Sequence, residues 1–197
     1  DRAFALNLTE KYGNNNQIAD TIAIEMSAFC AGLVNKKANG RGGFFKPALF
    51  SIDRVFLMGE KTMATPDGRK AGEPLSKNLC ATPAMDKNGI TALIRSVTKM
   101  DLAEFSTGSV LDFVLHPTAV QGEDGLVAFY GLLRTYFNLG GFAMHGNVFN
   151  VEDLRAAQKN PENYQTLQVR VCGWNAYFVN LSKIEQDTFI KQAEGAD

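Results

Sequence analysis

Apolar side chains recur along this chain at intervals that alternate between helical and strand-like spacing. Residues 17–35 show the helical interval, because five apolar side chains follow one another three or four positions apart: Ile18, Ile22, Met26, Phe29 and Leu33. Just before this segment lie three N-cap candidates, Asn14, Asn15 and Asn16. The pattern predicts an amphipathic helix over residues 17–35.

Two further helices are indicated in the middle of the chain. Apolar residues at helical spacing predict one over about residues 90–99. A longer one is expected over residues 125–139, where the pair Gly140 and Gly141 would end it.

Capping signals predict two helices near the carboxyl end. Asn150 is the N-cap candidate of a helix that stops before Pro161. Ser182 and Glu185 have the capping-box spacing, which opens a last helix that reaches about Ala193.

Strand-like segments lie between these helices. The apolar run 110–115 and the segments 142–149 and 166–171 are each expected to form a strand. The apolar segment 44–58 is broken by Pro47, so we expect short strand pieces there.

Two segments are rich in turn residues. Residues 36–43 form a glycine-rich loop, and residues 64–74 contain the turn pair Asp-Gly followed by Arg69. The simplest role for Arg69 is to tie this loop to neighbouring carbonyl groups.

The alternation of strands and helices predicts an α/β fold with a largely parallel sheet. No internal repeat, low-complexity tract or long linker interrupts the chain, so residues 1–197 are expected to form one unit.

Composition excludes several classes of function. The net charge is −1 and both signs are mixed along the chain, which argues against a nucleic-acid or membrane partner. No apolar run is expected to reach the length of a membrane span. The three cysteines, Cys30, Cys80 and Cys172, are scattered, which favours a reducing cytoplasm over a disulfide framework. With His116 and His145 as the only histidines, we expect no metal site.

Residues 170–178 read Arg-Val-Cys-Gly-Trp-Asn-Ala-Tyr-Phe, a glycine between apolar residues directly after a predicted strand. Gly173 could serve as a turn residue with positive φ. The segment also resembles the radical-bearing loop of glycyl radical enzymes, whose pattern is Arg-Val-x-Gly followed by an aromatic residue. Other blocks resemble the same family in order and spacing: residues 11–15, 65–74, 89–99 and 157–164. Together they span almost the whole chain.

The resemblance implies the C-terminal part of the α/β barrel of the pyruvate formate-lyase-like superfamily, with a glycine radical domain over about residues 65–197. The radical glycine would be Gly173, on a loop between late strands and a C-terminal helix. Arg170, Val171, Cys172 and Trp174 would shield it in dry, apolar surroundings. No cofactor is expected to be bound, because a radical S-adenosylmethionine activating enzyme installs the radical.

The strand before Asn150 departs from the family pattern. Family members commonly read Gly-Gly-x-His-x-Gln-x-Asn, whereas this chain has Ala143, His145 and Asn147 at the last three named positions. The strand runs near the active site in the family. The changes therefore indicate either an unusual substrate pocket or simple repacking, and both interpretations stay open.

The family's thiyl cysteine lies on an upstream loop that this chain lacks. Because the chain also begins without Met, we expect the C-terminal portion of a longer enzyme that is inactive alone. The sequence of residues 65–74 favours a lyase or dehydratase that acts on a small molecule, with formate C-acetyltransferase as the alternative. Further alternatives are a stand-alone subunit that replaces a damaged glycyl loop and a structural module without radical chemistry. Expected partners are the activating enzyme and the upstream part of the enzyme, and a homodimer is left open.

Overall fold

The computed structural model describes residues 4, 10–52, 54–171 and 173–194. Within these residues, four short 3-10 helices connect parts of the chain. The α-helices and strands run in the following order: α2 (Gln17–Val34), α3 (Arg54–Glu60), α4 (Gly89–Val97), β1 (Val110–Leu115), α5 (Gly122–Asn138), β2 (Ala143–Val148), α6 (Val151–Lys159), β3 (Gln168–Val171), β4 (Trp174–Tyr177) and α7 (Lys183–Glu194).

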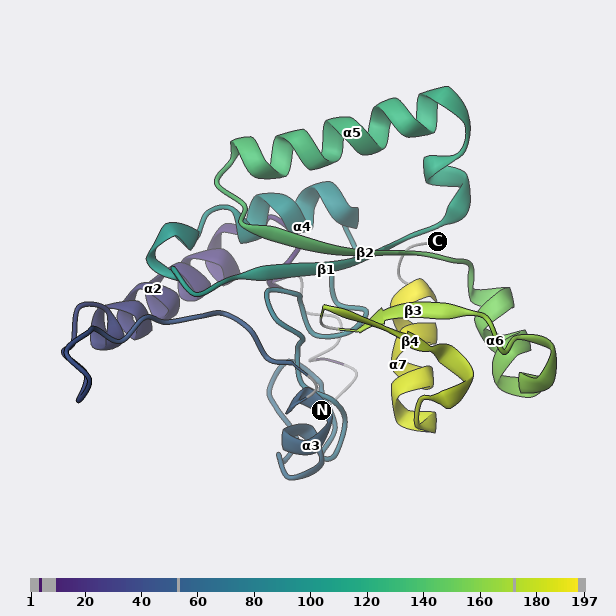
Figure 1. The fold of residues 1–197 in the computed structure, drawn as a ribbon, viewed down its shortest axis with the longest axis horizontal. Coiled ribbons are helices and arrows are strands. Elements are labelled where there is room, and N and C mark those ends of the chain that lie inside the picture. The colour runs from purple at the N-terminus through teal and green to yellow at the C-terminus, as the bar shows by residue number, and fades with distance from the viewer. Residues whose placement is uncertain (1–3, 5–9, 53, 172, 195–197) are drawn as a thin grey trace.

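A parallel pair of strands forms the centre of the structure. β1 and β2 pair in register from Val110 opposite Ala143 to Leu115 opposite Val148, and α5 makes the crossover between them. Figure 1 shows α4 and α5 on one side of this pair and the smaller β3–β4 hairpin with α6 and α7 on the other.

The expectation of a largely parallel sheet is wrong for the carboxyl-terminal part. β3 and β4 form a separate antiparallel pair, from Gln168 opposite Tyr177 to Val171 opposite Trp174. Only two residues separate these strands, and so short a connection can join only antiparallel neighbours. The α/β character of the prediction is confirmed by the observed elements.

Two clusters of buried side chains hold the elements together. One lies between α4, β1 and α5, where Val97, Leu111 and Tyr136 have no exposed surface. The other joins α6, β3 and α7 and contains Leu154 and Phe189. The parallel pair contributes to both clusters, because partly buried Val114 of β1 packs against the second. The hairpin is therefore held by its own core as well as by the sheet.

The predicted helix ends agree with the structure where a cap was identified. The side-chain oxygen of Asn16 accepts hydrogen bonds from the backbone N–H groups of Ile18 and Ala19, at 3.0 and 3.2 Å. The backbone N–H of Ser182 donates to the carboxylate of Glu185 at 2.9 Å, one half of a capping box.

The prediction for residues 44–58 is wrong. Phe44 and Leu49 make only isolated bridges, to Ala38 and Ser109, and the end of the segment belongs to helix α3. A short apolar run has no clear period, so helix and strand cannot be separated there by pattern alone.

Arg69 has the structural role expected of it. Its side chain is 5% exposed, and its guanidinium donates to four backbone carbonyls, those of Thr62, Met63, Lys70 and Glu73. The same loop is held by Asp67, whose carboxylate accepts hydrogen bonds from Thr65 and Thr82. Although burial acts in the opposite direction, these bonds hold the pKa of Asp67 below its usual range.

Helix α2 leaves most of its apolar face uncovered. Ile18, Met26 and Phe29 are between 57% and 62% exposed. By length and composition α2 could cross a membrane, contrary to the expectation from the sequence, although core helices of other proteins pass the same test. Its first turn instead carries fully buried Asp20, which forms an ion pair of 2.6 Å with Lys99.

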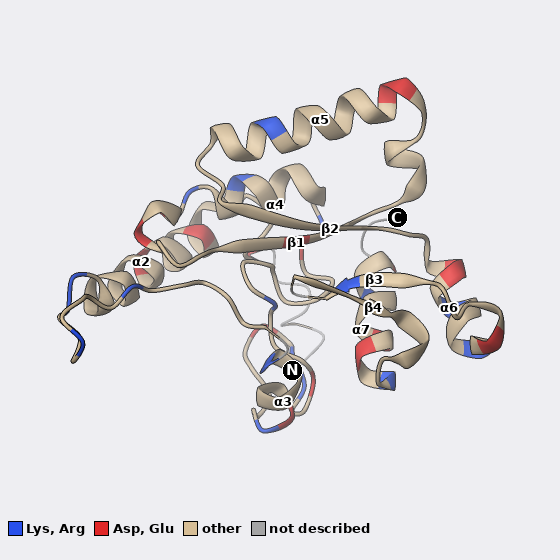
Figure 2. Cartoon of the chain, viewed as in Figure 1, with Lys and Arg blue, Asp and Glu red and all other residues tan. Residues whose placement is uncertain are grey.

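Figure 2 shows charges of both signs dispersed over the chain.

We expect Arg69→Met to destabilise the fold. The substitution keeps the bulk of the side chain but leaves four carbonyls without a charged donor, at a cost of about 3 kcal/mol. Urea denaturation followed by circular dichroism measures this loss. Arg41→Met is the matched control, because Arg41 is exposed in the glycine-rich loop and its loss should change stability by less than about 0.5 kcal/mol. Equal effects of both substitutions would contradict the role of Arg69.

Candidate functional site

Gly173 lies at the turn between β3 and β4. Its φ of +108° is in a region that L side chains rarely adopt, so the turn favours glycine for conformational reasons alone. The residue is exposed at the surface of this chain. Cys172, the other residue of the turn, lies outside the described residues.

Asn147 connects the hairpin to the parallel pair. Its side-chain oxygen accepts a hydrogen bond from the backbone N–H of Arg170 at 2.7 Å, and its side-chain N–H donates to the carbonyl of the same residue at 3.2 Å. The amide thus pairs with β3 as a neighbouring strand would. Asn147 is 8% exposed, and both of its polar atoms face the hairpin.

The other predicted residues of the loop have different positions. Val171 is 3% exposed and belongs to the core of α6, β3 and α7. The guanidinium of Arg170 points along the hairpin and donates to the side chain of Asn175 at 3.0 Å.

The expectation of dry surroundings is met by only part of the hairpin. Val169 and Phe178 are buried with Val171, whereas Trp174 and Tyr177 are each 46% exposed. In the strand register Trp174 lies opposite Val171 and Tyr177 lies opposite Gln168, so these two exposed aromatic side chains belong to opposite faces of the hairpin. That Trp174 shields Gly173 stays a prediction.

His145 takes part in a cluster of polar side chains that extends across the parallel pair. Its Nδ1 lies 3.3 Å from a carboxylate oxygen of Asp112, the residue opposite it in the strand register. The second oxygen of Asp112 accepts a hydrogen bond from the side chain of Asn78. The side chains of His145 and Asp112 are 15% and 10% exposed, so the pair is largely removed from water.

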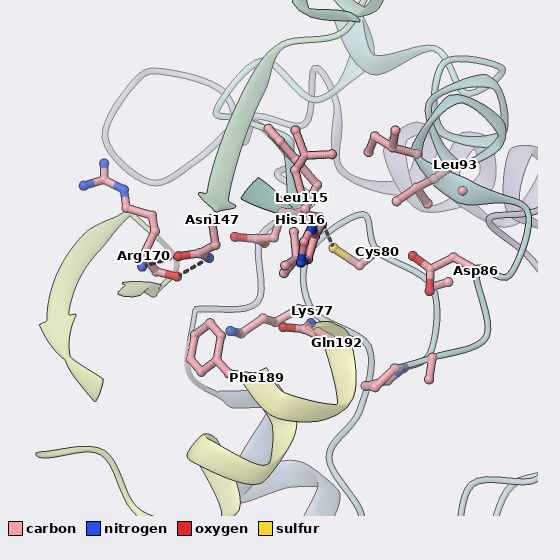
Figure 3. Close-up of a pocket in the computed structure, with 18 of the residues that line it drawn as sticks. Lys77, Cys80, Asp86, Leu93, Leu115, His116, Asn147, Arg170, Phe189 and Gln192 are labelled. Atoms are coloured by element: carbon pink, nitrogen blue, oxygen red, sulfur yellow. Dashed lines mark hydrogen bonds between the residues drawn. The ribbon is translucent and has the colours of Figure 1, made fainter. Parts of the chain in front are cut away.

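A cavity of about 270 Å³ lies on the same side of the sheet as the hairpin. Figure 3 shows Asn147 and Arg170 at one end of it and Lys77 against the ring of Phe189. The ammonium of Lys77 is 4.6 Å from the centroid of that ring, a cation–π contact. The Cys80 thiol donates to the backbone carbonyl of Asp112 at 3.0 Å, and burial raises the pKa of this thiol well above its usual value.

Two residues of this region were missed in the sequence. Asp112 lies inside the run 110–115 that the pattern predicts as an apolar strand, and Lys77 lies outside every segment named in the sequence analysis. The signal for Asp112 was present, because a carboxylate inside the run Val-Leu-Asp-Phe-Val-Leu has to find a partner once the strand is buried. Within the described residues, no group of three or more potential ligands could hold a metal ion.

Two family matches cover most of the chain. Residues 75–179 match the family described as "Glycine radical", and residues 2–59 match the family described as "Pyruvate formate lyase-like". The first match contains Gly173 and both strands of its hairpin. The chain belongs to the glycine radical family, as its resemblance to that family predicted.

Individual relatives are lyases and dehydratases. The chain is 37% identical over 185 residues to indoleacetate decarboxylase from Tractidigestivibacter scatoligenes, covering 93% of this chain and 21% of that protein. It is also 37% identical over 188 residues to trans-4-hydroxy-L-proline dehydratase from Clostridioides difficile, covering 95% of this chain and 24% of the relative. The chain thus spans less than a quarter of the length of these relatives.

The fold also matches solved structures. The glycerol-bound B12-independent glycerol dehydratase from Clostridium butyricum superposes with a TM-score of 0.91 at 39% identity. That match covers 97% of this chain and 24% of the dehydratase chain.

We expect Asn147→Leu to loosen the hairpin. Leucine has a similar volume but leaves the N–H and the carbonyl of Arg170 without partners, at a cost of about 1–3 kcal/mol for each group that stays buried. Hydrogen exchange measured by mass spectrometry should then become faster over residues 168–177. Asn175→Ala is the control, because Asn175 is exposed and its side chain bonds to the side chains of Arg170 and Gln168 in its own hairpin. Unchanged exchange in Asn147→Leu would show that the core alone holds the hairpin.

Proposed function

We propose that this chain stores an unpaired electron on the Cα of Gly173 for a larger glycyl radical enzyme. The observation that carries the proposal is the position of this glycine. It lies at the turn of a hairpin that Asn147 attaches to the sheet, inside the segment that matches the glycine radical family. The resemblance of residues 170–174 to the radical loop points to the same atom.

The chemistry requires glycine at this position for two reasons. Loss of one hydrogen atom from the Cα leaves an unpaired electron that the adjacent amide nitrogen and carbonyl delocalise. The radical carbon becomes planar, and without a Cβ it flattens with little steric resistance. The hydrogen atom is taken up by the radical that the activating enzyme supplies, so Gly173 loses one hydrogen atom and its chain bonds stay intact.

Storage of a carbon radical requires protection from water and oxygen. In this chain the turn is exposed, so the cover has to come largely from the rest of the parent enzyme. Relatives that are about four times longer than the matched segment support this assignment. Exposed apolar side chains on α2 and α5, such as Met26 and Val127, provide surface for the same missing part.

The reaction we propose is that of a lyase or dehydratase acting on a small molecule. Decarboxylases and dehydratases among the relatives favour this class over formate C-acetyltransferase. The stored radical would take a hydrogen atom from a cysteine thiol of the upstream part, and the resulting thiyl would attack the substrate. We assign the enzyme to the cytoplasm, because scattered cysteines fit a reducing compartment.

Gly173→Ala should abolish the radical. We expect the parent enzyme, treated anaerobically with its activating enzyme and S-adenosylmethionine, to give a doublet in the electron paramagnetic resonance spectrum. The doublet should be absent from Gly173→Ala. Exposure to air should cut the activated wild-type chain at residue 173 and leave Gly173→Ala uncut.

The matched control for this substitution is Gly42→Ala. Gly42 also has a positive φ, +79°, and a Cβ there would meet nothing within 4 Å, so the backbone strain is comparable. Gly42→Ala should keep the doublet. A doublet of wild-type intensity in Gly173→Ala would refute the assignment of the radical to this residue.

A further inference from the structure

One side chain of the described structure faces Gly173 from another element. A Cβ built on Gly173 would lie 3.6 Å from Cε1 and 3.9 Å from Nε2 of His145. Apart from neighbours along the chain, these are the only heavy atoms within 4 Å among the residues that the structure describes. Since a Cα–Cβ bond is about 1.5 Å long, the Cα of Gly173 lies within about 5 Å of the imidazole ring.

His145 and Asn147 face the hairpin from the same side of β2. Residues two apart in a strand share a face of the sheet, and here both reach towards the hairpin. Asn147 pairs with the backbone of Arg170 at the base of the turn, while the ring of His145 lies beside Gly173 in the turn. Asn147 lines the 270 Å³ cavity, whereas His145 is not among its lining residues.

Asp112 fixes the orientation of the His145 imidazole through the nitrogen Nδ1. The carboxylate of Asp112 can only accept a hydrogen bond, so Nδ1 of His145 carries the proton that is shared with it. Asn78 holds the other oxygen of the carboxylate, which prevents Asp112 from turning away. This arrangement presents the Cε1–Nε2 edge of the ring to Gly173.

We propose that His145, oriented by Asp112, is a positioning residue that covers the radical carbon of Gly173. The inference rests on the proposed function. A glycine has no side chain of its own to cover its Cα, and the neighbouring Trp174 is itself 46% exposed within this chain. The ring, which lies 3.6 Å from the position of a Cβ, supplies part of this cover from β2, and the parent enzyme would supply the rest.

The contact is testable because the radical is itself a magnetic probe. We would label the parent enzyme with ¹⁵N-histidine, activate it anaerobically and record pulsed electron paramagnetic resonance on the glycyl doublet. The expected result is a weak coupling between the unpaired electron and a histidine nitrogen. This coupling should be visible in the wild-type enzyme. The coupling should be absent from His145→Gln, the residue that the family pattern commonly has here. It should remain in His116→Gln, the matched control at the other histidine of this chain.

A second readout tests the covering role. We expect the doublet of His145→Ala to decay about tenfold faster than wild type under a fixed low oxygen pressure, the factor that corresponds to a barrier lower by about 1.4 kcal/mol. Asp112→Asn should shift the nitrogen coupling, because a changed partner at Nδ1 reorients the ring.

The outcomes separate the two proposals. A wild-type doublet without any histidine coupling, or a coupling that survives in His145→Gln, overturns the role of His145 and leaves radical storage intact. Equal decay in wild type and His145→Ala overturns the covering role. Absence of any doublet from the wild-type enzyme instead contradicts the proposed function itself.

Discussion

The pairing of the Asn147 side chain with the backbone of Arg170 is the contact on which the arrangement of the site depends. It joins the antiparallel hairpin to the parallel pair through one amide and not through a continuous strand ladder. Two hydrogen bonds of this kind contribute about 1 kcal/mol each to stability. Such a link orients the turn but yields to a modest free energy, and both properties would suit the proposed activating enzyme, which would have to reach the Cα of Gly173.

The same constraint explains how polar groups are distributed around the hairpin. One face of β3 and β4 packs on α7 and is apolar, so the polar contacts lie on the side that meets β2. There Asp112, His145 and Asn147 follow the register of the parallel pair. The uncovered apolar face of α2 and the open turn are surfaces that the proposed parent enzyme would bury, since large apolar patches rarely stay exposed.

Much of the fold could be predicted from local patterns. The strand at 110–115 and the caps at Asn16 and Ser182 depend on residues close in sequence, and they agree with the structure. The prediction of strand pieces over 44–58 was wrong, because an apolar run interrupted by Pro47 has no clear period that would separate helix from strand.

Less of the site could be predicted from the sequence, because its contacts join residues that are distant in sequence. Gly173 could be found from its loop motif, and Asn147 from the strand pattern, but the hydrogen bonds between residues 147 and 170 depend on packing. The pairing of Asp112 with His145 depends on the register of two strands separated by α5. A carboxylate in an apolar strand shows that a polar partner is required, but the sequence does not show which residue that partner is.

The most direct test of radical storage identifies the carbon that carries the unpaired electron. The parent enzyme is prepared with glycine labelled with ¹³C at the α-carbon, activated without oxygen and compared with unlabelled enzyme by electron paramagnetic resonance. The account predicts an additional large ¹³C splitting in the labelled sample. A radical signal that the label leaves unchanged would place the electron elsewhere and contradict the account.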